Sequence, residues 1–290
     1  MSPGARLRAL IAEGGVVEAM ACHNALTAHL AAEAGFEALW ASGFELAAAH
    51  GVPDAGVVSM AEHLAVCRQM AERTGGLVVA DLDTGFGNAV NLTYAVEAYE
   101  RAGVAAVVVE DKTFPKMTSL VPGGRQELAR IEEYQGKLEA ALAARRDPGL
   151  IVAARTEALI AGLGVDEALK RGEAYAEAGA DLLLVHSKAA TSAEIEAFIG
   201  RWSGAIPLIL VPTAFPSFGR EAARASGKVA MVIWANQGLG AAVRAMRDTF
   251  AAIRGEGSAA GVEDRIATVG DLLELQEMER VAELERRYLR

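Results

Sequence analysis

The chain has 290 residues, of which 52% are hydrophobic and 23% are charged, and its formal net charge is −10 at pH 7. This composition is typical of a globular protein with a large core and argues against disorder. The acidic balance argues against nucleic acid as a partner, because phosphate binding needs a basic face. The length is that of about two domains, or of one large α/β barrel.

The two cysteines, Cys22 and Cys67, have neither the pattern of a disulfide framework nor the spacing of metal ligands. A reducing cytoplasm is the simplest setting for such a chain. No apolar segment of a signal peptide follows Arg6 and Arg8. The longest uncharged stretch, 203–219, contains three prolines, whereas a membrane span needs roughly 20 mostly apolar residues. We therefore expect a cytoplasmic protein without a membrane partner.

Short apolar runs alternate with segments of helical spacing along the chain. Glycines such as Gly35 and Gly103 mark natural helix ends, and the unbroken apolar run before Glu110 is typical of a strand buried on both faces. Strands are expected over 16–20, 37–42, 77–81, 104–110, 150–155, 181–185, 207–211 and 229–234. Helices are expected over 24–35, 60–73, 88–103, 126–144, 165–178, 192–202, 218–226 and 236–254, with 43–59 irregular.

Strands that are each followed by a helix predict a (β/α)8 barrel of the TIM type, with a doubly wound parallel sheet as the alternative. Residues 255–261 form a linker rich in small residues, and 268–289 have the pattern of a charged amphipathic helix. A helix beyond such a linker can fold back on its own barrel or pack on another subunit. The expected domains are a barrel over 1–254 and a linker with a terminal helical segment over 255–290.

Acidic residues follow two neighbouring predicted strands, at the end where barrel enzymes carry their catalytic residues. Asp81 and Asp83 end the third strand and Glu110 ends the fourth. Alternate residues of an extended chain point to the same side, and carboxylate oxygens are ligands that Mg²⁺ prefers. The three acids are therefore candidate metal ligands. The alternative is that they cap helices or pair with Lys112 and Arg155.

Other polar groups at the same strand ends allow two interpretations each. Arg155 can clamp a phosphonate or carboxylate, or it can form a structural ion pair. His186 can bind ligand or transfer a proton, or it can be a simply hydrogen-bonded histidine. Residues 85–88, Gly-Phe-Gly-Asn, are a weak phosphate-loop candidate, and a tight turn with Asn88 as a helix N-cap is the favoured interpretation. The loop 112–124, with its prolines and glycines, is either a lid or a long ordinary connection.

Two segments, Asp-Leu-Asp-Thr-Gly-Phe-Gly-Asn at 81–88 and Glu-Asp-Lys-Thr-Phe-Pro-Lys at 110–116, resemble the signature segments of the phosphoenolpyruvate mutase/isocitrate lyase superfamily. Further matches fall in the superfamily's order over nearly the whole chain: Trp40-Ala-Ser42-Gly43, Asp54, Arg155-Thr-Glu157 and His186-Ser187. The resemblance implies a Mg²⁺-dependent barrel acting on α-keto acids, in which Mn²⁺ or Co²⁺ could substitute. It also implies a gating loop at about 112–124 and an eighth barrel helix exchanged between subunits, hence a homodimer or homotetramer.

The gating loop is where the reactions of the superfamily differ. Its lyases carry a Lys-Lys-Cys-Gly-His type of segment, whereas this chain has Phe-Pro-Lys-Met-Thr-Ser at 114–119 and no cysteine nearby. Its mutases have Asn where Thr118 stands. A Thr at this position resembles the sequence of the members that hydrolyse 3-phosphonopyruvate. The resemblance therefore implies Mg²⁺-dependent cleavage of the P–C bond to pyruvate and phosphate. The alternatives are the mutase isomerisation and an oxaloacetate-acting relative, and a binding protein without activity is a remote one.

The resemblance also implies three groups of site residues. The metal is held by Asp81 and, through water, by Asp83 and Glu110. The substrate-binding residues are Trp40, Ser42, Gly43, Phe44, Arg155 and His186. The catalytic residues are Asp54, Lys116, Thr118, Arg155 and His186.

The implied roles divide the substrate between two ends of the site. Backbone amides around 42–44 hold the carboxylate, and Arg155 and His186 hold the phosphonyl group. Thr118, with Lys116 and Asp54 nearby, orients the attacking water.

Overall fold

The computed structural model describes residues 1–121, 123–204 and 206–290. These residues form two compact units, Met1–Gly238 and Leu239–Arg290. Pro122, which belongs to the predicted gating loop, and Ala205 lie outside the described residues.

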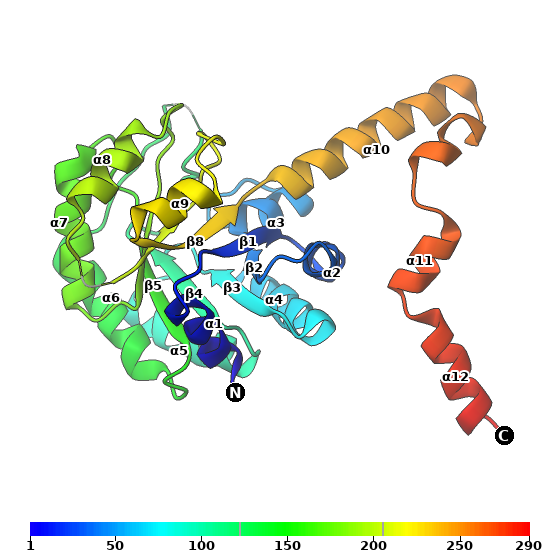
Figure 1. Ribbon diagram of the computed structural model, residues 1–290, viewed down its shortest axis with the longest axis horizontal. Helices are drawn as coiled ribbons and strands as arrows, with labels where there is room; N and C mark the ends of the chain where they lie inside the picture. The colour runs from blue at the N-terminus through cyan, green and yellow to red at the C-terminus, as the bar shows by residue number, and fades with distance from the viewer. Residues whose placement is uncertain (122, 205) are drawn as a thin grey trace. The chain divides into compact units, whose positions relative to one another are not determined.

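The first unit is a closed barrel of eight parallel strands in sequence order, which confirms the predicted fold class (Figure 1). Each strand pairs with the next, and β8 pairs with β1 through registers such as Met20 with Trp234. The strands are β1 (Val17–Cys22), β2 (Ala38–Ala41), β3 (Leu77–Asp81), β4 (Ala106–Glu110), β5 (Ile151–Thr156), β6 (Leu182–Val185), β7 (Leu208–Leu210) and β8 (Val229–Trp234).

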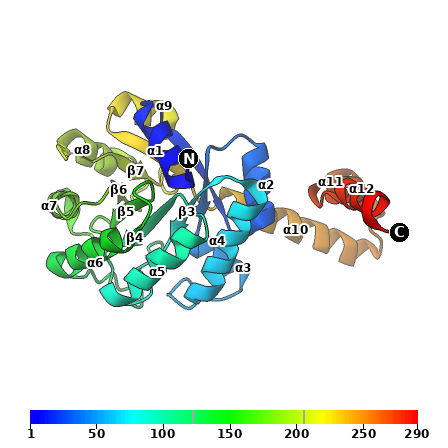
Figure 2. The same cartoon turned by 90° about the horizontal axis from the view of Figure 1, so that it is seen from below.

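Helices surround the strands, and α4 to α8 follow one another around the barrel, each packed against the next (Figure 2). The helices of this unit are α1 (Pro3–Ala12), α2 (Ala25–Glu33), α3 (Gly43–Ala49), α4 (Met60–Thr74), α5 (Ala89–Arg101), α6 (Ile131–Ala144), α7 (Gly164–Glu177), α8 (Ala193–Arg201) and α9 (Arg220–Ser226).

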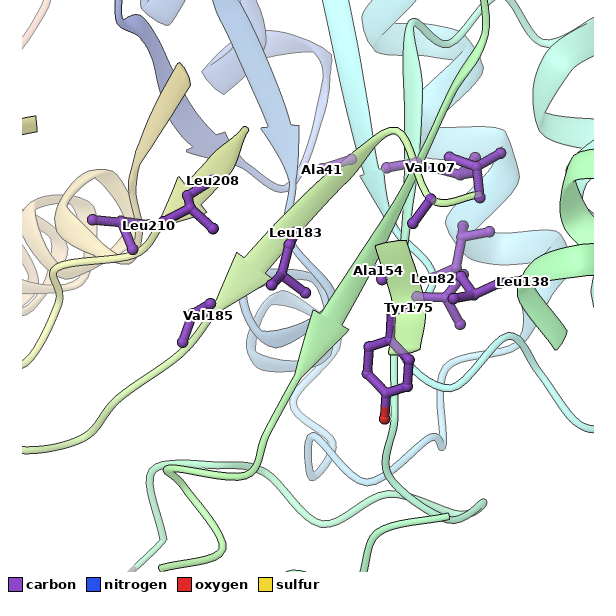
Figure 3. Close-up of a cluster of buried hydrophobic side chains, with 14 of the residues drawn as sticks. Ala41, Leu82, Val107, Leu138, Ala154, Tyr175, Leu183, Val185, Leu208 and Leu210 are labelled. Carbon is purple, nitrogen blue, oxygen red and sulfur yellow. The ribbon is translucent and has the colours of Figure 1, made fainter. Parts of the chain in front are cut away.

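The side chains of each strand alternate between two hydrophobic cores. On β2, Ala38 and Trp40 belong to the core inside the barrel, whereas Leu39 belongs to the core between strands and helices. Figure 3 shows part of the outer core, in which Leu183 of β6 lies near Leu208 of β7. Successive side chains of a strand point to opposite faces. Once one residue of a strand is known to point into the barrel, the other inward-pointing residues of that strand are therefore known as well.

Two helices of the barrel were not expected from the sequence. Helix α1 begins with Ser2 as its N-cap, and its Leu7 is fully buried in the inner core beside residues at the starts of several strands. Helix α3 occupies part of 43–59, which was expected to be irregular, and Ser42 is its N-cap. A helix of seven residues gives too little periodicity to be recognised from sequence.

Two predicted helices differ from the observed ones. Helix α6 was expected from residue 126 but begins at Ile131, because Leu128 instead forms a β-bridge with Lys112. The terminal helix expected over 268–289 is two helices, and Glu277 between them has a left-handed backbone (φ 54°).

The second unit contains the rest of α10 (Gln237–Glu256), then a 3-10 helix (Ala260–Arg265), α11 (Val269–Leu275) and α12 (Met278–Tyr288). Among its described residues only Val262 is buried, and large apolar side chains such as Phe250 are exposed. In the part of the chain that the structure describes, no helix has the length and apolar character needed to cross a membrane.

Candidate active site

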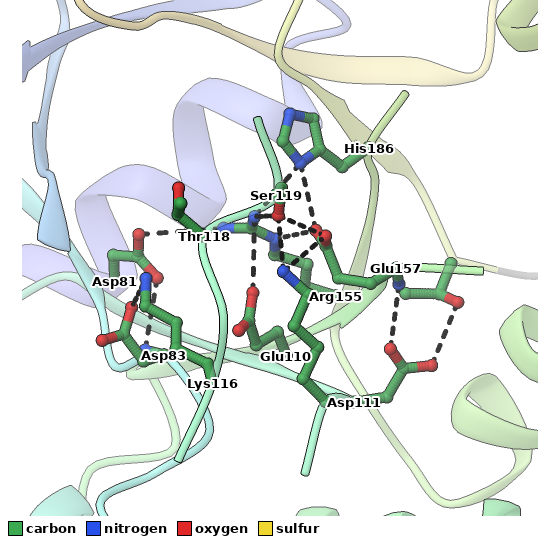
Figure 4. Close-up of polar contacts among 12 residues, drawn as sticks. Asp81, Asp83, Glu110, Asp111, Lys116, Thr118, Ser119, Arg155, Glu157 and His186 are labelled. Atoms are coloured by element: carbon green, nitrogen blue, oxygen red, sulfur yellow. Dashed lines mark hydrogen bonds and ion pairs between the residues drawn. The ribbon is translucent and has the colours of Figure 1, made fainter. Parts of the chain in front are cut away.

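The inward alternation of the strands continues into polar residues at the carboxyl end of the barrel. On β4, Ala106 and Val108 line the inner core and Glu110 follows them, and on β5 Ile151 and Ala153 lead to Arg155. Asp81, Glu110, Arg155 and His186 therefore converge on one region, as Figure 4 shows. The prediction that polar groups gather at one rim rests on this alternation, and the structure places them there.

A cavity with about 520 Å³ of open space lies at this rim. Nine of the predicted site residues line it: Trp40, Ser42, Phe44, Asp54, Asp81, Lys116, Thr118, Arg155 and His186. Three predicted residues, Gly43, Asp83 and Glu110, lie behind this lining. Asp83 contacts the lining residue Lys116 and Glu110 contacts the lining residue Arg155, and Gly43 follows the lining residue Ser42 in the chain.

Lys116 is buried between two carboxylates. Its Nζ lies 2.6 Å from Asp54 Oδ1 and 2.6 Å from Asp83 Oδ1. Burial alone would lower the pKa of Lys116, but the surrounding carboxylates raise it well above its ordinary value. The lysine is therefore a permanent cation that joins the loop after β4 to the loop after β3.

On the metal side of the site, Asp81 and Glu110 are buried and Asp83 is half-buried. Loss of solvent is the main cause that raises the pKa values of these three acids. The pKa of Asp83 is raised to about 6. Among the described residues, neither carboxylate oxygen of Glu110 has a hydrogen-bond partner, although Arg155 Nη2 lies 3.4 Å from Oε2. Buried oxygens that lack donors are suited to a cation or to its bound water.

The charges of the network leave room for a divalent cation. Five carboxylates meet three cations, which leaves an excess of two negative charges. The carboxylates are those of Asp54, Asp81, Asp83, Glu110 and Glu157, and the cations are Lys112, Lys116 and Arg155. Uncompensated charges are costly to bury, so a dication fits this site electrostatically.

The geometry limits how such an ion could be held. Across residues 1–121, 123–204 and 206–290, no three or more His, Cys, Asp or Glu side chains are grouped so that they could hold a metal ion. Mg²⁺ usually keeps several waters and takes only one or two protein carboxylates. Among the described residues, the three acids therefore suit a partly hydrated ion, and the site does not fit an ion enclosed by protein ligands.

Glu157 organises the opposite side of the site. Its Oε1 accepts a hydrogen bond from Arg155 Nε at 2.6 Å and lies 3.0 Å from His186 Nδ1, which is also 3.1 Å from Arg155 Nη2. Burial alone would raise the pKa of Glu157, but Arg155, His186 and Lys112 hold it well below its ordinary value. Arg155 is thus both an ion-pair partner and a cavity-lining guanidinium, so its two sequence interpretations are compatible.

Burial lowers the pKa of His186 from its ordinary value, although the carboxylate of Glu157 opposes this shift. A neutral imidazole has one donor and one acceptor nitrogen. Because Nδ1 faces Glu157 and Arg155, the ring is held in place against the cavity.

Several residues that shape the site were not assigned a role from sequence. Glu157 could have been found, because it lies two residues after Arg155, directly beyond the end of β5. Lys112 and Ser119 could not, because only the folded loop brings them to Glu157. Thr213 and Asn236 also line the cavity, and each has a buried oxygen without a hydrogen-bond partner among the described residues.

The segment 85–88 is a turn, as favoured from sequence. Asn88 is the N-cap of α5, and its side chain accepts hydrogen bonds from the backbone N–H groups of Val90 and Asn91. Gly85 and Gly87 have positive φ values of 84° and 146°. The glycines are therefore explained by the turn.

Gly43 is required for a close approach at the start of α3. A Cβ atom at this position would lie 2.9 Å from Asp83 Oδ1. The same oxygen contacts Lys116. Any side chain at 43 would therefore displace the carboxylate that we place beside the metal.

Comparisons with known proteins agree over nearly the whole chain. The model of a family described as phosphoenolpyruvate phosphomutase matches residues 7–254. Phosphonopyruvate hydrolase from Variovorax sp. (strain Pal2) is 51% identical over 290 residues, which is 100% of both chains. A crystal structure of phosphonopyruvate hydrolase in complex with oxalate and Mg²⁺ is similar with a TM-score of 0.94 and 49% identity over 100% of both chains. A crystal structure of phosphoenolpyruvate phosphomutase from Streptomyces platensis subsp. rosaceus has a TM-score of 0.96 and 46% identity over 99% of both chains.

The contact between Gly43 and Asp83 predicts the effect of one methyl group. Gly43→Ala should weaken Mg²⁺ binding by about tenfold, a loss of roughly 1.4 kcal/mol, since it displaces a charged hydrogen-bonding group. Isothermal titration calorimetry with Mg²⁺ measures this change. Gly136→Ala is the matched control, because a Cβ at Gly136 meets open space and alanine favours its helix. Equal Mg²⁺ affinity in wild type and Gly43→Ala would contradict the role given to this contact.

Proposed function

The chain belongs to the phosphoenolpyruvate phosphomutase family, and on this premise we propose that it hydrolyses the P–C bond of 3-phosphonopyruvate to pyruvate and phosphate, with Mg²⁺ as cofactor. The observation that carries the proposal is Thr118 at the wall of the cavity that Lys116, Arg155 and His186 also line. The chain that carries Thr118 is 51% identical over its full length to a phosphonopyruvate hydrolase. The fold alone does not distinguish the reactions, since a mutase structure is as similar as a hydrolase structure.

The site offers a separate surface to each end of a phosphonate α-keto acid. The first backbone N–H groups of α3 have no partners within the helix, and they lie next to Ser42, which lines the cavity. We assign them to the carboxylate, beside Trp40. Arg155 and His186 are assigned to the phosphonyl group, because a guanidinium matches tetrahedral oxyanions through paired hydrogen bonds.

Mg²⁺, when bound by Asp81 and through water by Asp83 and Glu110, supplies Lewis-acid stabilisation for the negative charge that develops on the keto acid. The fixed cations of the chain act beside it. Arg155 is oriented by Glu157 at 2.6 Å, so little reorganisation is needed as charge moves onto the phosphonyl oxygens.

The proposed reaction consumes one water. The P–C bond breaks with its electron pair passing to carbon, which gives the enolate of pyruvate, and the phosphorus gains the water oxygen. One proton of the water passes to the enolate carbon and the other remains on the phosphoryl group, which leaves as phosphate. Thr118 orients the water, and Lys116 and Asp54, which are paired at 2.6 Å, hold the neighbouring wall of the site. Positioning and charge neutralisation are expected to dominate such a transfer.

The mutase reaction is the second candidate. There the phosphoryl group would return to the enolate oxygen instead of meeting water. The specific observation in its favour is the high similarity to a phosphoenolpyruvate phosphomutase structure. Thr118, at the position where the superfamily's mutases have Asn, favours hydrolysis. An oxaloacetate-acting enzyme is a third candidate, since it would use the same metal and carboxylate sites.

We further propose that residues 1–254 form the barrel, with a gating loop at 112–124. We propose that its eighth helix, α10, and the helices beyond it pack on a partner subunit in a homodimer or homotetramer. The support is the apolar surface of the second unit, in which Phe250, Val269 and Leu284 are exposed. Large exposed apolar patches mark interaction sites. Cys22 and Cys67 are free thiols, which suits the cytoplasm as the site of action.

Phosphorus NMR tests the reaction directly. Wild-type protein with Mg²⁺ should convert phosphonopyruvate to inorganic phosphate, and Asp81→Ala should lower kcat by roughly a thousandfold, about 4 kcal/mol of lost transition-state stabilisation. Asp166→Ala is the matched control, because Asp166 is exposed in a surface ion pair. A phosphoenolpyruvate signal as the main product would overturn hydrolysis. Consumption of oxaloacetate without turnover of phosphonopyruvate would favour the third candidate.

The proposed role of Thr118 predicts a loss confined to turnover. Thr118→Ala should lower kcat for hydrolysis by about 10- to 100-fold while the melting temperature stays near that of wild type, because the half-buried side chain orients water and contributes little to the core. Steady-state kinetics and thermal unfolding measure the two quantities. Thr113→Ala, an exposed contact in the same loop, should leave both unchanged. An unaltered kcat in Thr118→Ala would remove Thr118 from the mechanism.

The oligomer proposal predicts a change of mass. Size-exclusion chromatography with light scattering should give two or four times the chain mass of 30.3 kDa. Phe250→Glu should reduce it, since the charge would be buried against the partner. Asp248→Asn is the control, because residue 248 lies on the opposite side of α10 in helical geometry. A monomeric wild-type protein would contradict the proposal.

A further inference from the structure

Lys112 lies at the start of the gating loop and is fully buried. The proposed chemistry gives this lysine no role. Its Nζ donates to the backbone carbonyl of Met117 at 2.9 Å and to Ser119 Oγ at 2.6 Å, and lies 3.2 Å from Glu157 Oε2. An ammonium group has three donors, and these three acceptors satisfy them. Two of the three acceptors belong to the far part of the loop.

Ser119 is the point at which the loop meets the anion clamp. Its hydroxyl donates to Glu157 Oε2 at 2.5 Å and accepts from Lys112 Nζ, and Arg155 Nη2 lies 3.4 Å away (Figure 4). The other oxygen of Glu157 holds Arg155 and His186. One buried carboxylate therefore binds the loop with one oxygen and orients the clamp with the other.

Thr118 lies between the two loop residues that Lys112 binds. The carbonyl of Met117 and the side chain of Ser119 are both held by the same ammonium group. The backbone of Thr118 is held as well, because its carbonyl accepts from Gln126 Nε2 at 3.0 Å. The position of the Thr118 side chain at the cavity therefore depends on contacts made by its neighbours.

An open loop would separate these contacts. Lys112 would keep Glu157 but lose the acceptors on Met117 and Ser119, and a buried charged donor without acceptors is costly. The closed arrangement is favoured as long as Lys112 stays buried. Glu157 and Lys112 thus stabilise closure without touching the cavity themselves, since neither lines it.

We propose that Ser119 is a positioning residue which, with Lys112 and Glu157, latches the gating loop closed and sets Thr118 in place over the anion clamp. The proposal rests on the proposed function for its effect on turnover, whereas the latch itself is a property of the folded chain. A hydroxyl that only filled space would give neither a loop-specific effect nor coupling to Lys112.

Limited trypsin digestion of the purified full-length protein, followed by mass spectrometry, measures the latch without any substrate. Trypsin can cut after Lys116, which is buried, and after Arg125, which is exposed. Ser119→Ala and Lys112→Met should each speed cleavage after Lys116 by about tenfold or more, because each loses at least one charge-assisted hydrogen bond and cleavage follows the open population. Cleavage after Arg125 is the internal reference and should not change. Thr113→Ala is the matched loop control and should behave as wild type.

Kinetics on the same variants separate positioning from binding. In Ser119→Ala, kcat for phosphonopyruvate should fall about tenfold while KM changes little, because Glu157 still orients Arg155 and only the placement of Thr118 is loosened. The double variant Lys112→Met with Ser119→Ala should be no worse than the worse single variant, since both remove one latch.

Four results would overturn the proposal. They are wild-type protection of Lys116 in Ser119→Ala, an unchanged kcat in that variant, multiplied effects in the double variant, and rapid cleavage after Lys116 in wild type. The digestion needs no turnover. A protein that fails the phosphorus NMR test but shows the variant-specific cleavage would refute the proposed function and keep the latch.

Discussion

The in–out alternation of eight closed parallel strands is the constraint on which the rest of this protein depends. Side chains such as Ala106 and Val108 fill the inner core, and the next residue of the same parity is Glu110. On β3 and β5, the residues that follow the inner-core side chains with the same parity are Asp81 and Arg155. A packed barrel interior therefore delivers its polar residues to one rim, because the side-chain period of a strand is two.

This arrangement concentrates charged side chains in a buried region. Charges can be buried only when they are paired, and the described network meets this requirement on the Arg155 side, where Glu157 is shared by a guanidinium and an imidazole. On the other side the pairing is incomplete, with the oxygens of Glu110 lacking donors among the described residues. The imbalance has the sign and size that a divalent cation would neutralise.

The loop after β4 adds chemistry that the barrel does not fix. Lys116 joins it to the acids after β3, and Lys112 with Ser119 joins it to Glu157. A single loop thus contacts both the metal side and the anion side of the site. Relatives with the same barrel and different reactions can be understood on this basis, because function is set by the site that a fold carries.

The sequence by itself determined the barrel and most of its rim, because strand–helix alternation and the polar ends of apolar runs are local patterns. It placed Asp81, Glu110 and Arg155 at strand ends correctly. It missed α1 and α3, whose short helices are stabilised by capping and burial, and it began α6 too early because it could not see Leu128 paired with Lys112. Only the tertiary structure decided which residues hold the loop 112–124 in place, since contacts between residues 112, 119 and 157 join segments whose separation along the chain carries no periodic signal.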